Sequence, residues 1–105
     1  MADIFKILQQ AQQMQGRLQQ MQEELQARTV TASSGGGMVS VEADGKGQLR
    51  KIKIDPSVVN PADVEMLEDL IVVAITEAQK KAAELAQEEM GKVAGGLNLP
   101  FKLPF

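Results

Sequence analysis

The sequence predicts an α+β fold in which a long N-terminal helix, a three-stranded antiparallel sheet and a long C-terminal helix follow one another in the order α-β-β-β-α. Three observations predict it. Apolar residues recur at helical spacing in residues 1–27, alternate with period two in residues 28–56, and return to helical spacing in residues 60–94. A chain of 105 residues suits one domain with one modest core. We therefore expect a single domain, 1–105, that ends in an extended tail, 95–105.

The first predicted helix carries apolar residues three and four positions apart, as in a heptad pattern. The stripe consists of Ile4, Ile7, Ala11, Met14, Leu18, Met21 and Leu25. At about 1.5 Å per residue, a helix from residue 3 to residue 27 is roughly 37 Å long, which is more than a small sheet can cover. Part of it should project as an arm. The stripe can pack on the second helix of its own chain, but we favour a partner chain for at least part of it.

Nine glutamines lie between Gln9 and Gln26 and give the arm a polar, uncharged surface. Glutamine side chains can donate hydrogen bonds to the phosphates or base edges of a nucleic acid. The composition is therefore compatible with an arm that lines a groove for a polymer.

Residues 28–56 should form three strands, separated by the Gly35-Gly36-Gly37 break and by a glycine-rich turn at residues 44–47. Their apolar face is predicted to contain Val30, Ala32, Val39, Val41, Ala43, Ile52 and Ile54. Arg50 shares the phase of the two isoleucines, but near the turn its long side chain can reach solvent. Asp55-Pro56 should end the third strand, because proline cannot donate to a ladder.

The hairpin is basic on its polar side. Lys46, Arg50, Lys51 and Lys53 are present, and no acidic residue lies between Lys46 and Ile54. Lysine on an edge strand can simply discourage aggregation, or it can contact a nucleic acid. Both interpretations stay open from the residues alone.

The second helix should begin at Asn60-Pro61-Ala62-Asp63, with Asn60 as N-cap, Pro61 at the first helical position and Asp63 in the first turn. Its middle is apolar nearly all round, so it should be buried on more than one side. One side can face the sheet, and the other most simply meets a second copy around a two-fold axis. We expect a homodimer whose interface contains Leu67, Leu70, Ile71, Val73, Ala74, Ile75 and Ala78.

Composition argues against catalysis. The chain has no histidine, cysteine, tryptophan or tyrosine, and therefore lacks the usual general base, the thiol nucleophile and the soft metal ligands. We expect no enzyme activity, no cofactor or metal, and no small-molecule substrate. Residues 1–10 lack the pattern of a signal peptide, and the longest apolar run, 70–75, is too short for a membrane span. We expect a cytoplasmic protein without a membrane partner.

The net charge of −3 is unevenly distributed along the chain. Residues 1–60 hold seven basic and six acidic residues, whereas residues 61–105 hold four basic and eight acidic residues. The N-terminal part is therefore the better candidate for contact with a polyanion.

Four parts of the sequence carry a family resemblance. They are Gln10-Ala-Gln-Gln-Met-Gln with Met21-Gln-Glu-Glu-Leu, Ile54-Asp-Pro-Ser, Glu65-Met-Leu-Glu-Asp-Leu, and Gly96-Leu-Asn-Leu-Pro-Phe-Lys-Leu-Pro-Phe. In this order they resemble the YbaB/EbfC family of small bacterial nucleoid-associated proteins over nearly the whole chain. The resemblance implies an α-β-β-β-α protomer, an intertwined tweezer-like homodimer, and binding of double-stranded DNA with little sequence selectivity.

The resemblance also implies that the first helix is the DNA-gripping arm, with the end of the second helix nearby. Together with the basic hairpin, this makes the candidate DNA contacts Lys6, Arg17, Arg28, Arg50, Lys51, Lys53, Lys80 and Lys81. Family arms commonly alternate glutamine with lysine, but Gln13 and Gln20 are neutral here. We therefore expect weak, salt-sensitive binding.

Two functions stay open. The first is a nucleoid-associated protein that contributes to chromosome organisation and to gene regulation. The second is a cytoplasmic adaptor or scaffold of DNA recombination or repair, which acts through its heptad arms and the aromatic tail. That tail, 97–105, can pack back on the dimer or serve as a docking peptide. A concave surface lined by cations of both copies favours DNA, and an apolar concavity favours the adaptor.

Overall fold

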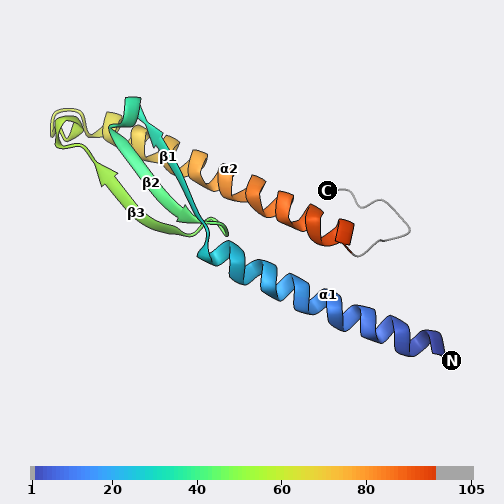
Figure 1. Cartoon of the computed structure of the whole chain (residues 1–105). Helices are drawn as coiled ribbons and strands as arrows, with labels where there is room; N and C mark the ends of the chain where they lie inside the picture. The colour runs from blue at the N-terminus through green and yellow to red at the C-terminus, as the bar shows by residue number, and fades with distance from the viewer. Residues whose placement is uncertain (1, 97–105) are drawn as a thin grey trace.

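Two long helices and a three-stranded sheet make up the structure, a computed structural model that describes residues 2–96. The elements are α1 (Ala2–Ala27), β1 (Thr29–Ser34), β2 (Val39–Asp44), β3 (Leu49–Ile54) and α2 (Val64–Gly96), with 3-10 turns at Gly35–Gly37 and Pro56–Val58. This order confirms the predicted α-β-β-β-α fold (Figure 1).

The strands form an antiparallel meander in the order β1-β2-β3, and α2 lies across β1 and β2. Inward-facing side chains of these two strands meet small residues of α2. The buried cluster contains Ala32, Val39, Val41, Ala43, Val58, Ala74 and Ala78. The alanines of α2 let the helix lie close to the sheet, and the alternation along β1 and β2 supplies the opposing apolar face.

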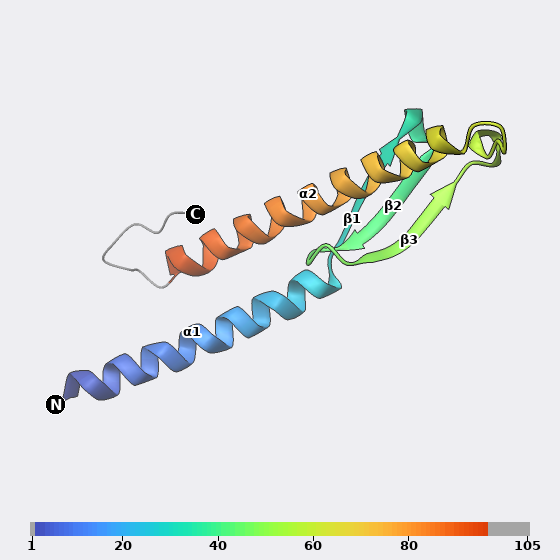
Figure 2. The same ribbon diagram turned by 180° about the vertical axis from the view of Figure 1, so that it is seen from behind.

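The C-terminal end of α1 is the only part of this helix that is buried within the described residues. Met21 and Leu25 are 7% and 4% exposed and lie beside Ala82 and Ala86 of α2, whereas Ile4 and Ile7 are 59% and 63% exposed. Both views show α1 and the C-terminal half of α2 leaving the same end of the sheet (Figures 1 and 2). The long first helix therefore projects as an arm, as its length predicts.

The predicted start of the second helix is wrong. Asn60 accepts a hydrogen bond from the Ala62 N–H through Oδ1 (3.0 Å) and one from the Asp63 N–H through its backbone oxygen (2.9 Å). Residues 60–63 therefore form a turn, and Asp63 caps α2 by accepting from the Met66 N–H at 3.2 Å. Asn-Pro is as typical of a turn as of a helix start, and in this chain it forms a turn that precedes the helix.

The predicted phase of Arg50 is also wrong, because β3 contains a bulge. Glu42 pairs with Lys51 and Ala43 with Leu49, which leaves Arg50 as the extra residue of the strand. Leu49 thus takes the inward position opposite Ala43, and Arg50 leaves the apolar face.

Candidate nucleic-acid interface

Between Asp3 in its first turn and Glu23 near its base, α1 carries positive charge and no carboxylate. Lys6 and Arg17 are the only charged residues between Ile4 and Gln22, and both are exposed. They are three helical turns apart, about 16 Å along the axis, and therefore lie on the same side of the helix. Gln10, Gln13 and Gln20 share this side. Because the apolar stripe lies roughly 100° away, the two stripes can serve different contacts.

Lys51 and Lys53 lie on the outer face of β3, on the side of the sheet away from α2. They pair with Glu42 and Ser40 of β2 and are exposed. Among residues 2–96, neither lysine side chain has a hydrogen-bond or ion-pair partner. Their ammonium groups remain available for an anion.

Arg28 is held by an acidic residue of α2. Its guanidinium lies 3.9 Å from the carboxylate of Glu89. The same carboxylate forms an ion pair with Lys92 Nζ at 3.2 Å. The backbone N–H of Arg28 donates to Glu24 O and Leu25 O in the last turn of α1. This residue joins the base of the arm to α2, so contact with a phosphate would compete with Glu89.

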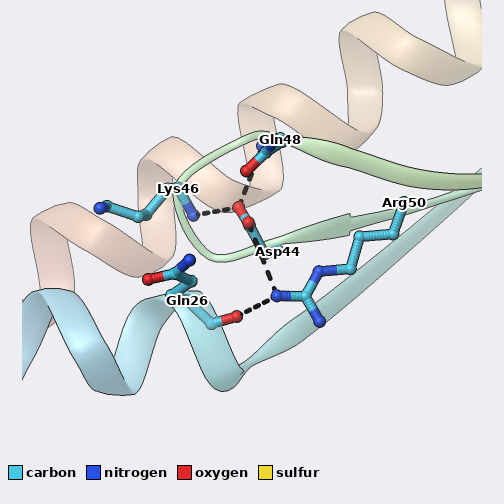
Figure 3. A network of polar contacts seen from close by, with 5 residues as sticks. All are labelled: Gln26, Asp44, Lys46, Gln48 and Arg50. Atoms are coloured by element: carbon cyan, nitrogen blue, oxygen red, sulfur yellow. Dashed lines mark hydrogen bonds and ion pairs between the residues drawn. The ribbon is translucent and has the colours of Figure 1, made fainter.

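Arg50 is held by the hairpin and by α1. Its Nη2 donates to the backbone oxygen of Gln26 and lies 3.7 Å from Asp44 Oδ2 (Figure 3). The bulge that displaces Arg50 from the apolar face thus aims its side chain at the end of the arm.

Lys80 and Lys81 lie beside the opposite edge of the sheet. Lys81 Nζ donates to Thr31 O at 2.7 Å, which satisfies a carbonyl of the open β1 edge. The Lys80 side chain is exposed and has no such partner within residues 2–96. Acidic Glu77 and Glu84 lie on the same part of α2.

In the single chain the eight predicted cations therefore fall into four groups. Lys6 and Arg17 lie on the arm, Arg28 and Arg50 at its base, Lys51 and Lys53 on the outer face of the sheet, and Lys80 and Lys81 beside β1. The first and third groups combine exposure with a lack of partners among residues 2–96.

The residues predicted to form the dimer interface also differ in how far they are buried within their own chain. Ala74 and Ala78 are fully buried against the sheet of their own chain, and Leu67, Leu70, Ile71 and Ile75 are partly buried beside that core. Val73 is 50% exposed and its neighbour Val72 is 61% exposed. In the single chain, α2 thus exposes these two valines, and it also exposes Val64 and Met66 in its first turn.

The sequence reasoning missed Asp44, the most deeply buried acidic residue among residues 3–93, at 1% exposed. Its Oδ1 accepts the backbone N–H groups of Lys46 (2.9 Å) and Gln48 (3.0 Å). These hydrogen bonds, that from Gln48 above all, hold the pKa of the Asp44 carboxyl below its ordinary value against the opposing effect of burial. Asp-Gly-Lys-Gly after a strand is typical of such a turn and was the available signal.

Within residues 2–96 no helix is both long and apolar enough to cross a membrane, and no three acidic, histidine or cysteine side chains gather into a metal-binding group. The predicted docking tail, 97–105, lies outside the described residues.

Comparisons with known proteins extend over nearly the whole chain. The YbaB/EbfC DNA-binding family matches residues 1–97. A nucleoid-associated protein of Gemmatimonas aurantiaca is 63% identical over 103 residues, which cover 98% of this chain and 99% of that relative. A nucleoid-associated protein of Syntrophobacter fumaroxidans is 48% identical, with coverage of 95% and 92%.

A solved structure supports the fold. The crystal structure of an uncharacterized protein from Helicobacter pylori superimposes with a TM-score of 0.75 and 26% identity, covering 90% of this chain and 96% of the other. The family match extends across α1, the sheet and α2, and the two relatives are matched over nearly their full length. This chain therefore belongs to the YbaB/EbfC DNA-binding family.

Proposed function

We propose that this chain is a nucleoid-associated protein that binds double-stranded DNA as a homodimer with little sequence selectivity. In this role it contributes to chromosome organisation and gene regulation. We place it in the cytoplasm, associated with the nucleoid, and assign it no enzyme activity. The observation that supports the proposal most is the carboxylate-free surface of the arm, from Ile4 to Gln22, in a chain whose net charge is −3. The relatives named nucleoid-associated proteins support the same role.

The arm is suited to the DNA backbone rather than to base edges. Lys6 and Arg17 supply two cations on one side of α1, and the glutamines between them can donate hydrogen bonds to phosphate and sugar oxygens. Contacts of this kind fix the position of a protein on the duplex but carry little sequence information. Two arms in a dimer double the number of phosphate contacts.

Exposed apolar surface supports the homodimer. Val72 and Val73 of α2 are exposed, and so is Ile52 of β3, at 44%, because α2 covers only the other two strands. A two-fold interface that covers these side chains would complete the core of each protomer. Of the interface residues predicted from sequence, we retain Leu67, Leu70, Ile71, Val73 and Ile75 for this contact.

A specific observation keeps the adaptor function as the second candidate. Near the tip of the arm, Ile4, Phe5, Ile7 and Leu8 are 59%, 75%, 63% and 55% exposed. An apolar cluster of this kind suits contact with another protein, such as one of recombination or repair. If it is the functional surface, Phe5→Ser abolishes capture of that protein while DNA binding by the arm cations is retained.

The test is a titration of two duplexes of unrelated sequence at two salt concentrations. With four arm cations in the dimer, we expect similar affinities for both duplexes and a loss of about 100-fold between roughly 50 and 200 mM salt. Absence of binding to either duplex near 50 mM salt would contradict the proposal, because phosphate contacts are strongest there.

A further inference from the structure

We infer that the turn between β2 and β3 forms the C-terminal cap of α1, and that Arg50 positions the arm rather than contacting phosphate. This inference rests on the proposed function only in its consequence for DNA. Its structural part concerns α1 and the hairpin of a single chain.

The carbonyl oxygens at the end of a helix lack partners within the helix. At the end of α1, the oxygen of Leu25 accepts the backbone N–H of Arg28 at 3.1 Å and also that of Gly45 at 2.7 Å, and the oxygen of Gln26 accepts a hydrogen bond from Nη2 of Arg50. The Gly45 and Arg50 donors come from the hairpin. The hairpin thus adds two contacts to the one that the residue directly after the helix supplies.

Arg50 adds a side-chain connection between the hairpin and the arm to the backbone hydrogen bond from Gly45 to Leu25. One contact reaches Gln26 on the arm, and the other reaches Asp44, whose carboxylate is fixed by the N–H groups of Lys46 and Gln48 (Figure 3). Because two backbone N–H groups of the turn hold the Asp44 carboxylate, this carboxylate can orient the guanidinium toward the end of α1.

The approach of the turn to the helix is close enough to require glycine. A Cβ on Gly45 would lie 2.5 Å from the oxygen of Leu25 and 3.0 Å from its Cα. The backbone of the hairpin therefore touches the backbone of the arm, and a change at the turn is transmitted directly to α1.

A small rotation at the base of the arm causes a large displacement of its tip. From Met21 to Ala2 the helix extends about 28 Å, so a rotation of about 10° at the base displaces the tip by about 5 Å. In a dimer with two arms, such a displacement changes the width available to a duplex. Arg50 can thus affect DNA binding without touching DNA.

The geometry can be measured without DNA. The chain has no cysteine, so Gln9→Cys and Gln87→Cys place two unique spin labels on exposed positions of α1 and α2. Mixing labelled protein with excess unlabelled protein isolates the distance within one protomer. We expect Arg50→Gln to shift or broaden this distance by several ångströms. Arg50→Lys should act alike, because one ammonium cannot reproduce the guanidinium's planar array of donors.

Lys53→Gln is the matched control, since it removes the same charge from the same strand and should leave the distance unchanged. Asp44→Asn gives an independent variant, which should broaden the distance because it removes the charge that holds Arg50. Circular dichroism verifies that each variant retains its fold. A wild-type distance distribution in both Arg50→Gln and Asp44→Asn would overturn the inference.

DNA titration separates positioning from phosphate contact. Positioning predicts that Arg50→Lys and Arg50→Gln weaken binding alike, by several-fold, with an unchanged dependence on salt. A phosphate contact instead predicts that lysine preserves binding and that glutamine lowers the salt slope of the dimer by about two, and this second pattern would overturn the assignment. Failure of the wild-type protein to bind DNA would reject the proposed function. The distance measurement would still show whether Arg50 positions α1.

Discussion

The backbone N–H of Gly45, in the turn between β2 and β3, donates to the backbone oxygen of Leu25 in the last turn of α1 at 2.7 Å. Leu25 is 4% exposed and also contributes to the contact between α1 and α2. The turn between β2 and β3 therefore contacts Leu25, a residue that also helps to attach the arm to α2. Substitutions at this contact should affect stability as well as arm direction.

Gly45→Ala should destabilise the protein by about 1 to 3 kcal/mol, because its Cβ requires the turn and the helix end to separate. The measurement is urea unfolding at a fixed protein concentration. Gly16→Ala is the matched control, since no atom lies within 4 Å of the added Cβ, and it should stabilise the helix by up to about 1 kcal/mol. Wild-type stability in Gly45→Ala would contradict the close contact.

Ser34→Ala should lower the free energy of unfolding by about 1 kcal/mol. The hydroxyl of this buried serine donates to Leu70 O of α2 at 2.5 Å and thus connects the end of β1 to the helix. Ser33→Ala, on the exposed side of the same strand, should change stability by less than about 0.5 kcal/mol. Equal effects of the two changes in urea unfolding would argue against a stabilising role for the Ser34 hydroxyl.

Stability should fall in acid partly through Asp44. The folded state lowers the pKa of this carboxyl from its ordinary value of 3.8, so the unfolded chain binds the proton more tightly. The stabilisation is present above pH 3.8 and is lost as the pH falls through the lowered value. Asp55, whose pKa is lowered by hydrogen bonds from Ser57, acts in the same direction.

Thermal unfolding between about pH 7 and pH 2 tests this linkage. Asp44→Asn should be less stable than wild type at neutral pH, and the difference should shrink in acid. Parallel pH profiles of the two proteins would exclude Asp44 as a contributor.

Val73→Glu should weaken the proposed homodimer, because it introduces a charge into the apolar surface of α2. Sedimentation at micromolar concentration should give twice the chain mass for wild type and a shift toward the monomer for the variant. Gln87→Glu adds the same charge at an exposed polar position and should remain dimeric. A monomeric wild type would refute the dimer.

Much of the fold could be predicted because burial follows local periodicity. Val39 and Val41 are 0% and 1% exposed, as the alternation along their strand predicts. The bulge at Arg50 could not be read in the same way, since one extra residue shifts the phase without changing the composition. At Asn60 the sequence pattern predicted a helix start, but Asn-Pro also favours turns, and the turn is the structure that forms.

The candidate site was less predictable than the fold. That Lys6 and Arg17 share a side of the arm follows from helical geometry alone. The partners of Arg28 and Arg50 depend on how α2 and the hairpin meet the end of α1, which no local pattern reveals. Charge alone therefore identified the basic residues but did not show that Arg28 pairs with Glu89 and that Arg50 contacts Gln26 and Asp44.

The most direct test of DNA binding by the arms is the salt dependence of affinity in Lys6→Gln/Arg17→Gln. If these residues contact phosphates in both protomers, the salt slope should decrease by up to about 4 relative to wild type, equally for unrelated duplexes. Lys51→Gln/Lys53→Gln removes the same charge from the sheet and should change the slope less. A wild-type slope in the arm variant, with the loss found in the sheet variant, would contradict binding by the arms.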